Sequence, residues 1–304
     1  MNISIVMINY NSTRHTLECL QSIADSQPKV SFEVIVVDNA SQAEQLENLQ
    51  QEIGAYPWAK LIINPLNLGF SGGNMSGYPH ATGDYLFFLN NDTQVSPHCL
   101  DVLHHFMESH PEVALCSPTI FSETNQHTAS FEFIPSVANK LFGASLLRLL
   151  QPSNYPQRKQ QHQQPIKVPV ISGATMFFRR QDFEQLGGYD TKYFLYCEEE
   201  DFAIRLRDAN KAIYLLNEAK VVHSGGGSTE RDLAIEKEFY ISFYRLLDKH
   251  YSRLSKIIIK ALYIIKECKR VLKKPERKPL LAFLLKGAPE SESLRYQQSS
   301  QDMQ

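Results

Sequence analysis

A polar cluster in the first third of the chain has the residue types of a metal and phosphate site. The cluster consists of Asn90, Asn91, Asp92 and Thr93. An Asp flanked by amide side chains suits a hard divalent cation that bridges to a substrate phosphate, because oxygen atoms are the preferred ligands of such ions. The same residues also fit a simple strand-to-helix turn, with Ser96 as N-cap and Pro97 as the first helical residue.

A second cluster contains four consecutive carboxylates, Glu198, Glu199, Glu200 and Asp201. Aromatic residues at positions 193, 194 and 196 come directly before it and suggest a partly dry pocket. Burial and mutual repulsion raise the pKa of carboxyl groups, which makes them plausible general bases at neutral pH. Acids are also favoured in the first turn of a helix by the helix dipole alone, so the pattern leaves both interpretations open.

Three further polar signals follow apolar runs. Asp38 comes after residues 32–37 and has the chemistry to accept a hydrogen bond from a base or ribose, or to form a turn before Ser41. The glycine-rich residues 67–74 allow backbone N–H groups to approach an anion, although a plain loop is an alternative. His223 precedes a Ser-Gly-Gly-Gly-Ser hinge and is either a metal ligand or, as single histidines more often are, a structural residue.

The elements that must position these residues alternate along the N-terminal half. Apolar runs at 3–8, 32–37, 60–63 and 85–89 read as buried strands, the last of them bulky throughout. Helical patterns follow, with caps predicted at Ser12 or Thr13, a Ser41–Glu44 capping box, and a helix from Pro97 to about Ser109. Such alternation predicts βαβ units and a parallel sheet, whose strand ends are the usual place for ligands.

The second half is less regular. Residues 118–140 show no clear period, and the Gln-rich residues 151–165 are predicted to form a mobile loop because they cannot bury a core. Short strands are predicted at 168–171, 176–178, 213–216 and 220–222, with a helix after the four acids. From residue 230 the pattern is helical, and the polar tail 290–304 is predicted to be disordered.

Composition narrows the class of protein. With 304 residues, 43% hydrophobic residues and a net charge of −2, the chain has no global attraction to nucleic acid. Its five scattered cysteines include no Cys-x-x-Cys pair, which argues against a disulfide framework or a structural zinc site. A reducing, cytoplasmic setting is expected, since we identify neither a signal peptide nor a transmembrane run of about 20 apolar residues.

A basic segment near the C-terminus has an amphipathic pattern. Between residues 254 and 286, apolar positions alternate with lysines and arginines. A helix of this kind can lie at an anionic membrane surface. Packing of the helix on the rest of the protein, with solvated lysines, is an equally good alternative.

Taken in order, these motifs resemble the family 2 glycosyltransferases of the GT-A fold, especially bacterial rhamnosyltransferase-like members, over about residues 3–250. The motifs are Asn9-Tyr10-Asn11, Val37-Asp38-Asn39-Ala40-Ser41, residues 67–74, Leu89-Asn90-Asn91-Asp92-Thr93, Gly173-Ala174, Gly188-Tyr189-Asp190 and Glu198–Phe202 with Arg205. The resemblance implies an α/β fold with a Rossmann-like, mostly parallel sheet flanked by helices. It implies a catalytic domain at 1–250 with a nucleotide-sugar half (1–117) and an acceptor half (118–250), a helical extension at 251–289, and the tail.

The resemblance also implies roles for single residues. The donor-binding set would be Tyr10, Asp38, Asn39, Asn67, Gly69, Phe70, Asn74, Asn90 and Asn91. Asp92 matches the last acid of the family's metal-binding D-x-D-type motif, whose first acid is replaced by Asn90, and His223 is a second metal candidate. Glu199 stands where the family's catalytic base is expected, with Glu198 and Asp201 as alternatives.

The function implied is an inverting glycosyltransferase that uses Mg²⁺ or Mn²⁺ and a nucleotide-diphospho-sugar. The favoured donor is dTDP-rhamnose, and the acceptor is a saccharide or lipid-linked sugar of cell-surface polysaccharide synthesis at the inner face of the membrane. The alternative is a catalytically inactive nucleotide-sugar or glycan-binding module. A Rossmann dehydrogenase is disfavoured because Asn9-Tyr10-Asn11, rather than a glycine turn, follows the first strand.

Overall fold

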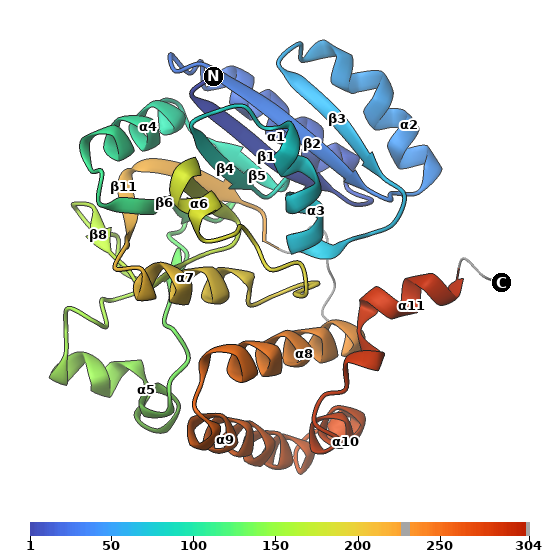
Figure 1. The fold of residues 1–304 in the computed structure, drawn as a ribbon, viewed down its shortest axis with the longest axis vertical. Helices are drawn as coiled ribbons and strands as arrows, with labels where there is room; N and C mark the ends of the chain where they lie inside the picture. Colours follow the sequence, from blue (N-terminus) through green and yellow to red (C-terminus); the bar gives the residue numbers. More distant parts are fainter. Residues whose placement is uncertain (226–231, 302–304) are drawn as a thin grey trace.

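The structure is a computed structural model that describes residues 1–225 and 232–301. Part of the predicted glycine hinge (226–228), the expected helix start at 230 and the last three residues of the tail therefore lie outside the described residues. Within the described part, a central nine-stranded sheet has helices on both faces and a layer of helices from the C-terminal part below it (Figure 1).

The sheet is parallel in its first half and mixed beyond it. The strands β3 (Ala59–Asn64), β2 (Phe32–Asn39), β1 (Ile3–Asn9) and β4 (Tyr85–Leu89) lie side by side in that order and are parallel. The next strands are β10 (Thr175–Arg179), β6 (Val113–Phe121), β11 (Ala212–His223) and β5 (Thr93–Val95). β11 is parallel to β6, whereas β10 is antiparallel to both its neighbours, and β5 and β8 (Ile166–Lys167) are antiparallel to β11.

Alternation of side chains along the strands creates two cores. Residues such as Ile5 and Phe87 face the helices α1 (Thr13–Asp25), α2 (Ala43–Glu52) and α4 (Cys99–Ser109). Their neighbours, such as Val6 and Phe88, face the other side and pack with residues of α6 (Arg180–Gln185) and α7 (Glu198–Asp208). The helix α3 (Gly69–Gly77) lies against β1 and β2. The buried apolar runs that the sequence shows are therefore the strands that organise the domain.

A third core joins α7 to the C-terminal helices. It contains residues of α8 (Leu233–His250), α9 (Arg253–Val271) and α10 (Lys278–Leu285), together with Tyr193 and Ile204. The predicted boundary at residue 250 falls between α8 and α9, yet α8 packs with the helices that follow it, so the helical layer begins before that boundary. None of the described helices combines the length and apolarity that a bilayer-spanning segment requires.

Several local predictions are corrected by the structure. The glycine-rich stretch forms helix α3 rather than a loop, and Thr93 opens strand β5 rather than a simple turn. Helix α4 begins at Cys99, after His98 in a left-handed conformation, instead of at Pro97. The two short strands predicted at 213–222 are one strand, β11, with an irregular register between Leu216 and Lys220.

Of the predicted caps, Ser12 is confirmed in position as the N-cap residue of α1, whereas the N-cap of α2 is Gln42 rather than Ser41. Neither Ser12 nor Ser41 makes a side-chain capping bond to its helix. Ser12 instead accepts a hydrogen bond from Asn91, and Ser41 accepts bonds from Asn9 and Asn11. The hydroxyls that looked like helix caps connect neighbouring strand ends to each other.

Two segments are more ordered than predicted. Helix α5 (Val137–Leu150) begins at the end of the region 118–140, which shows no clear period, and continues through residues 141–150, for which no element is predicted. Within the predicted disordered tail, a short turn (Glu290–Glu292) and helix α11 (Leu294–Gln301) follow α10. The Leu294 N–H donates to Glu238 of α8, and Lys237 pairs with Glu292, so polar contacts rather than apolar burial hold this segment.

Candidate active site

The two predicted metal residues meet at the edge of the sheet. Asp92 directly precedes β5 and His223 ends β11, and these strands pair with Thr93 opposite His223. As a result, His223 Nε2 lies 3.0 Å from Asp92 Oδ1, and the Ser224 N–H donates to the Asp92 carbonyl. No cluster of three or more His, Cys, Asp or Glu residues suitable for a metal occurs in the described part of the chain. A cation here would have two protein donors and would need substrate oxygens or water for the rest.

The amide residues beside Asp92 have different surroundings. The Asn90 N–H donates to the carbonyl of Ala174, which ties the end of β4 to the start of β10. Asn91 is buried, and its amide donates to Ser12 and Thr16 at 2.7 and 2.8 Å. Both amide hydrogens of Asn91 therefore hold α1 against the strand ends, and its role in donor binding stays a prediction that only its side-chain oxygen could fulfil.

Asp38 and Asn39 are likewise committed to the fold. Asp38 is fully buried, and its two carboxylate oxygens accept from Asn9 Nδ2 at 2.8 Å and from the Ser41 N–H at 3.0 Å. The Asn39 amide donates to Asn67 and to the Gly69 carbonyl, and it accepts from the Leu68 N–H. Direct contact of these two side chains with a nucleotide stays a prediction. They fix the loop and helix that border the predicted donor site, beside the exposed ring of Tyr10.

The start of α3 is a point of close packing. Gly69 has a φ of +72°, and a β-carbon there would lie 2.0 Å from the Phe194 carbonyl oxygen. The same carbonyl accepts a hydrogen bond from the Phe70 N–H at 2.7 Å. Glycine is required because the segment that leads to the four acids approaches α3 this closely. Asn74 is buried in α3, so Asn67 and Phe70 are the partly accessible members of the predicted donor set within residues 67–74.

The four acids open helix α7, as the sequence predicts. The chain enters the helix through Tyr196 and Cys197, both in left-handed backbone conformations that cost energy for residues other than glycine. This reversal brings the Glu199 carboxylate against Gly173, where a β-carbon would lie 3.7 Å from its Oε1 atom. Gly173 is next to Ala174, whose carbonyl binds Asn90, so the acid cluster and the end of β4 are close neighbours.

Burial changes the proton affinity of the three glutamates. Burial is the main cause that raises the pKa of Glu198 to about 8, with the neighbouring acids adding to it. The pKa of Glu199 is raised well above its ordinary value by burial first and then by Glu200 and Glu198. Each of the three has one buried carboxylate oxygen without a hydrogen-bond partner among the described residues. Buried polar atoms of this kind are uncommon and mark a site built for a ligand.

Asp201 differs from the other three acids. Arg205 Nε, His250 Nε2 and Lys249 Nζ approach its carboxylate to 3.0, 2.7 and 2.7 Å. Burial alone would raise the pKa of Asp201, but Lys249, Arg205 and His250 outweigh it and lower the pKa. Asp201 is therefore ionised and connects α7 to α8, and its role as an alternative base stays a prediction.

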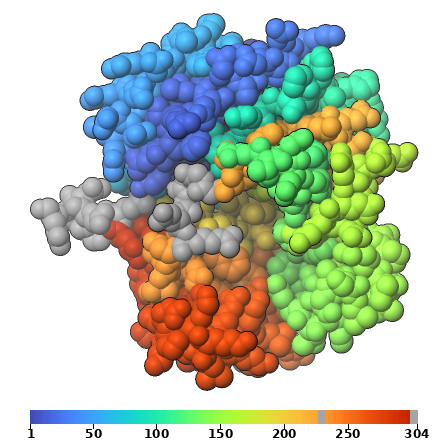
Figure 2. Space-filling view, turned by 180° about the vertical axis from the view of Figure 1, so that it is seen from behind, coloured from blue at the N-terminus to red at the C-terminus, as the bar shows by residue number. Residues whose placement is uncertain are grey.

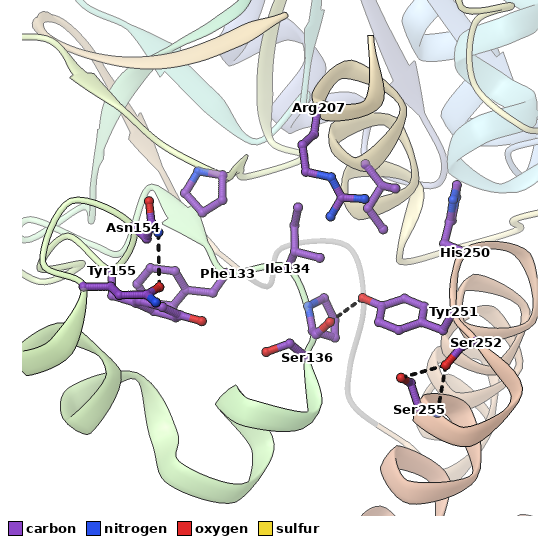
Figure 3. Close-up of a pocket in the computed structure, with 14 residues that line it drawn as sticks. Phe133, Ile134, Ser136, Asn154, Tyr155, Arg207, His250, Tyr251, Ser252 and Ser255 are labelled. Carbon is purple, nitrogen blue, oxygen red and sulfur yellow. Dashed lines mark hydrogen bonds between the residues drawn. The ribbon is translucent and has the colours of Figure 1, made fainter. Parts of the chain in front are cut away.

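A cavity of about 550 Å³ lies at the other end of α7 (Figure 3). Arg207 of α7 and Tyr251 after α8 project toward it, and Tyr251 donates a hydrogen bond to the Pro135 carbonyl. His250 lines the same cavity while it contacts Asp201. Eight residues separate Arg207 from Glu199, so the cavity is roughly 12 Å along the helix from the candidate base.

Comparison with known proteins identifies this arrangement. The model for glycosyl transferase family 2 matches residues 4–187, which include every strand end described above except that of β11. The chain belongs to glycosyl transferase family 2. It is therefore a glycosyltransferase that uses a nucleotide-sugar donor, and its helical layer lies beyond the matched region.

Relatives of this glycosyltransferase span several sugars. It is 26% identical over 263 residues to the N-acetylglucosaminyl-diphospho-decaprenol L-rhamnosyltransferase of Mycobacterium tuberculosis, covering 81% of this chain and 84% of that protein. Its structure resembles GalNAc-T7, solved with UDP, GalNAc and Mn²⁺, with a TM-score of 0.64, 16% identity and coverage of 88% and 51% of the two chains. This glycosyltransferase thus spans about half of the GalNAc-T7 chain. The mannosyltransferase of Pyrobaculum calidifontis, solved with GDP-Man and Mn²⁺, has a TM-score of 0.55, 16% identity and coverage of 93% and 69%. These likenesses confirm the predicted GT-A fold.

Some functional neighbours in this glycosyltransferase carry no sequence signal. Lys249 and His250 end an ordinary amphipathic helix, and only the packing of α8 on α7 brings them to Asp201. Lys140 of α5 is similar, because its charge acts on Glu200 from a helix that the sequence does not predict. Their positions depend on tertiary packing rather than on local pattern.

Proposed function

We propose that the protein is an inverting glycosyltransferase with Glu199 as its catalytic base. The observation that carries the proposal is the Glu199 carboxylate itself, which lies beside Gly173 with a buried, unpartnered oxygen and a raised pKa. Glu198 is more deeply buried, and Asp201 is paired with Arg205 and Lys249 and contacted by His250, so neither is as available for proton transfer.

In this proposal, the acceptor hydroxyl lies between Glu199 and the anomeric carbon of the donor sugar. Glu199 takes the hydroxyl proton as the acceptor oxygen forms its bond to the anomeric carbon. The bond from that carbon to the phosphate oxygen breaks, and its electron pair leaves with the nucleoside diphosphate. Attack from the face opposite the leaving group inverts the anomeric configuration. A raised pKa makes Glu199 a better proton acceptor, which is its part in the reaction.

The proposed metal ligands are Asp92 and His223. A carboxylate and an imidazole 3.0 Å apart at a strand end suit one Mg²⁺ or Mn²⁺, with the donor diphosphate completing the ligand set. When bound, such an ion supplies Lewis-acid stabilisation of the departing diphosphate. Both structural neighbours were solved with Mn²⁺, which supports this assignment. Asn67, Phe70, Asn90 and Tyr10 remain the proposed donor-contacting residues, with Gly69 shaping the cleft.

Rhamnose, carried by dTDP, is the proposed donor sugar because the mycobacterial relative is a rhamnosyltransferase. The acceptor named for the same relative is a sugar linked to a lipid through a diphosphate. A lipid-linked or polysaccharide acceptor is therefore proposed for this protein as well. Such an acceptor would place the protein at the cytoplasmic face of the membrane, with residues 254–286 in contact with it. The cavity near Arg207, with its aromatic rings and hydroxyls, would then receive the part of the acceptor distant from the reacting hydroxyl.

The test is to incubate the protein with a panel of nucleotide-sugars and Mn²⁺ and to follow both thermal stability and nucleoside diphosphate release. A donor that binds the native state raises the apparent melting temperature. We expect the largest rise with dTDP-rhamnose and release that depends on an added acceptor. An inactive binding module would show the rise in melting temperature without any acceptor-dependent release.

A further inference from the structure

Helix α5 exposes apolar side chains that no other described residue covers. None of its residues is buried, and Leu149 and Leu150 are 80% and 73% exposed. The other exposed apolar residues of the helix are Leu141, Phe142 and Leu146. Gly143, with φ 74° and ψ 156°, kinks the helix between the two groups. A contiguous apolar surface on this scale marks an interaction site rather than ordinary surface variation.

Helix α9 has two opposite faces. Ile259 and Glu267 are buried, and Tyr263 packs beside them in the third core. The opposite side carries Leu254, Ile257, Ile265 and Leu272, all exposed and the last 86% so. Three of these residues form one stripe along the helix: Leu254, Ile265 and Leu272. Their spacings of eleven and seven residues are close to three and two whole helical turns of about 3.6 residues. The apolar residues that predicted an amphipathic helix thus face outward, away from the core.

The two helices are neighbours. Lys140 of α5 donates a hydrogen bond to the Tyr263 hydroxyl of α9 at 2.7 Å, and both helices lie at the end of the molecule remote from the sheet (Figure 1). The view from behind shows the segment that contains α5 directly beside the C-terminal helices (Figure 2). We call the exposed apolar residues of these two helices the α5–α9 surface.

Positive charge borders this surface. Lys266, Lys269, Lys273 and Lys274 are exposed at the C-terminal half of α9 and just beyond it. Among the described residues, none of these four forms an ion pair with an acid. By contrast, Lys256 and Lys260 on the inner side of α9 both pair with Asp248. Apolar residues bordered by uncompensated lysines match the two parts of an anionic bilayer, its acyl boundary and its charged head groups.

We propose that the α5–α9 surface binds the interface of an anionic membrane, with leucines of α5 and α9 inserted and the lysines on the head groups. The assignment extends the predicted basic segment to α5, which the sequence did not single out. It is independent of which sugar is transferred. One consequence rests on the proposed function: Gln151 follows α5 and Ser252 and Ser255 lie at the start of α9, and all three line the cavity at Arg207. A lipid-linked acceptor would therefore meet that cavity between the two membrane-bound helices.

The test is flotation of the full-length protein with phosphatidylcholine vesicles that contain or lack phosphatidylglycerol. We expect binding to the anionic vesicles, and a decrease of roughly tenfold or more for Leu149→Glu/Leu150→Glu and for Ile265→Glu/Leu272→Glu. Lys266→Glu/Lys269→Glu should weaken binding to anionic vesicles and leave the weak binding to neutral ones unchanged. The matched control is Ile63→Glu, on the remote edge strand β3, where the side chain is 48% exposed.

Each variant is also compared by melting temperature and by donor turnover with a water-soluble acceptor, which should match the wild type because these residues lie outside the site. Leu149→Ser/Leu150→Ser provides a milder change if the glutamates unfold the helix.

Equal flotation of the wild type and the three paired variants would overturn the proposal. So would a wild-type dimer in light scattering that Leu149→Glu/Leu150→Glu converts to a monomer, because the surface would then join two copies of the chain. If the wild-type protein floats with anionic vesicles but shows no donor turnover, the result contradicts the proposed function and leaves the membrane proposal intact.

Discussion

The Glu199 carboxylate lies against the bare backbone of Gly173, with 3.7 Å between its Oε1 atom and the position that a β-carbon at residue 173 would take. Glycine leaves a small open space beside the candidate base, next to the strand end that carries Asn90. A methyl group at residue 173 would fill that space without a steric clash, because 3.7 Å is an ordinary van der Waals distance.

The first prediction concerns this contact. Gly173→Ala should fold normally but place a methyl group beside Glu199, which removes water and raises the pKa of the carboxyl group further. Since the base must be deprotonated, the acid limb of the pH–kcat profile should move to higher pH, and kcat at neutral pH should fall several-fold. Gly54→Ala is the control, because no atom lies within 4 Å of its added β-carbon. Identical pH profiles for the two variants would show that the Glu199–Gly173 contact has no part in turnover.

The metal assignment gives a second prediction. Asp92→Ala should abolish Mg²⁺- or Mn²⁺-dependent turnover and the rise in melting temperature that Mn²⁺ and donor produce together. His223→Ala should weaken both effects less, since a carboxylate is the better ligand for a hard cation. Near-normal activity of Asp92→Ala in the presence of a chelator would mean that neither residue holds an essential metal.

The brace around Asp201 gives a third prediction. Asp201→Asn should lower the free energy of unfolding by about 3 kcal/mol at neutral pH, because it removes the buried carboxylate that neutralises Arg205 and Lys249. Asp208→Asn is the control, since Asp208 pairs with Arg207 at the surface. Urea denaturation of both variants measures the difference.

The pH dependence of this stabilisation follows from the lowered pKa of Asp201. The folded protein holds the ionised form more tightly than the unfolded chain does, so the stabilisation is fully present above the unfolded pKa of about 3.8. It is lost as the pH falls through the lower folded value. If the difference in free energy of unfolding between the wild type and Asp201→Asn stays constant down to that pH, the ion pairs of Asp201 are not the source of the stabilisation.

How much of this site the sequence predicts depends on the type of residue. The buried run at 85–89 is apolar throughout and the run at 3–8 is apolar except for Ser4, so their strand identity follows from composition, and the position of Asp92 follows from the run at 85–89. Asp38 and Asn91 show the limit. A polar side chain at a strand end binds either a ligand or the next strand end, and only the folded hydrogen bonds distinguish the two.

Helix α5 escaped prediction for a different physical reason. Secondary structure is read from the periodicity of a buried face, and α5 has no buried residue. The same holds for the contacts of Lys249 and His250 with Asp201, which require the packing of two helices far apart in the sequence. The left-handed Tyr196 and Cys197 also have no sequence signal, since neither is a residue that favours this conformation.

A fourth prediction separates Glu198 from Glu199. The pKa of Glu198 is raised to about 8, mainly by burial, so the folded protein keeps this proton where the unfolded chain loses it. Stability contributed by the protonated group is therefore present below the unfolded value of 4.5 and lost as the pH rises through about 8. Glu198→Gln should make the protein more stable than the wild type at alkaline pH. If the difference in melting temperature between Glu198→Gln and the wild type is the same at acidic and at alkaline pH, Glu198 is not buried in its protonated form.

The central claim is tested most directly by kcat of Glu199→Gln, measured with saturating donor and acceptor. The substitution keeps the shape of the side chain and removes its ability to accept a proton. We predict a fall in kcat of about 10²–10⁴-fold, as expected for loss of a general base, while calorimetry gives a donor Kd within a few-fold of the wild type. Normal turnover by Glu199→Gln, together with loss of turnover in Glu198→Gln or Asp201→Asn, would contradict the account and place the base elsewhere in the acid cluster.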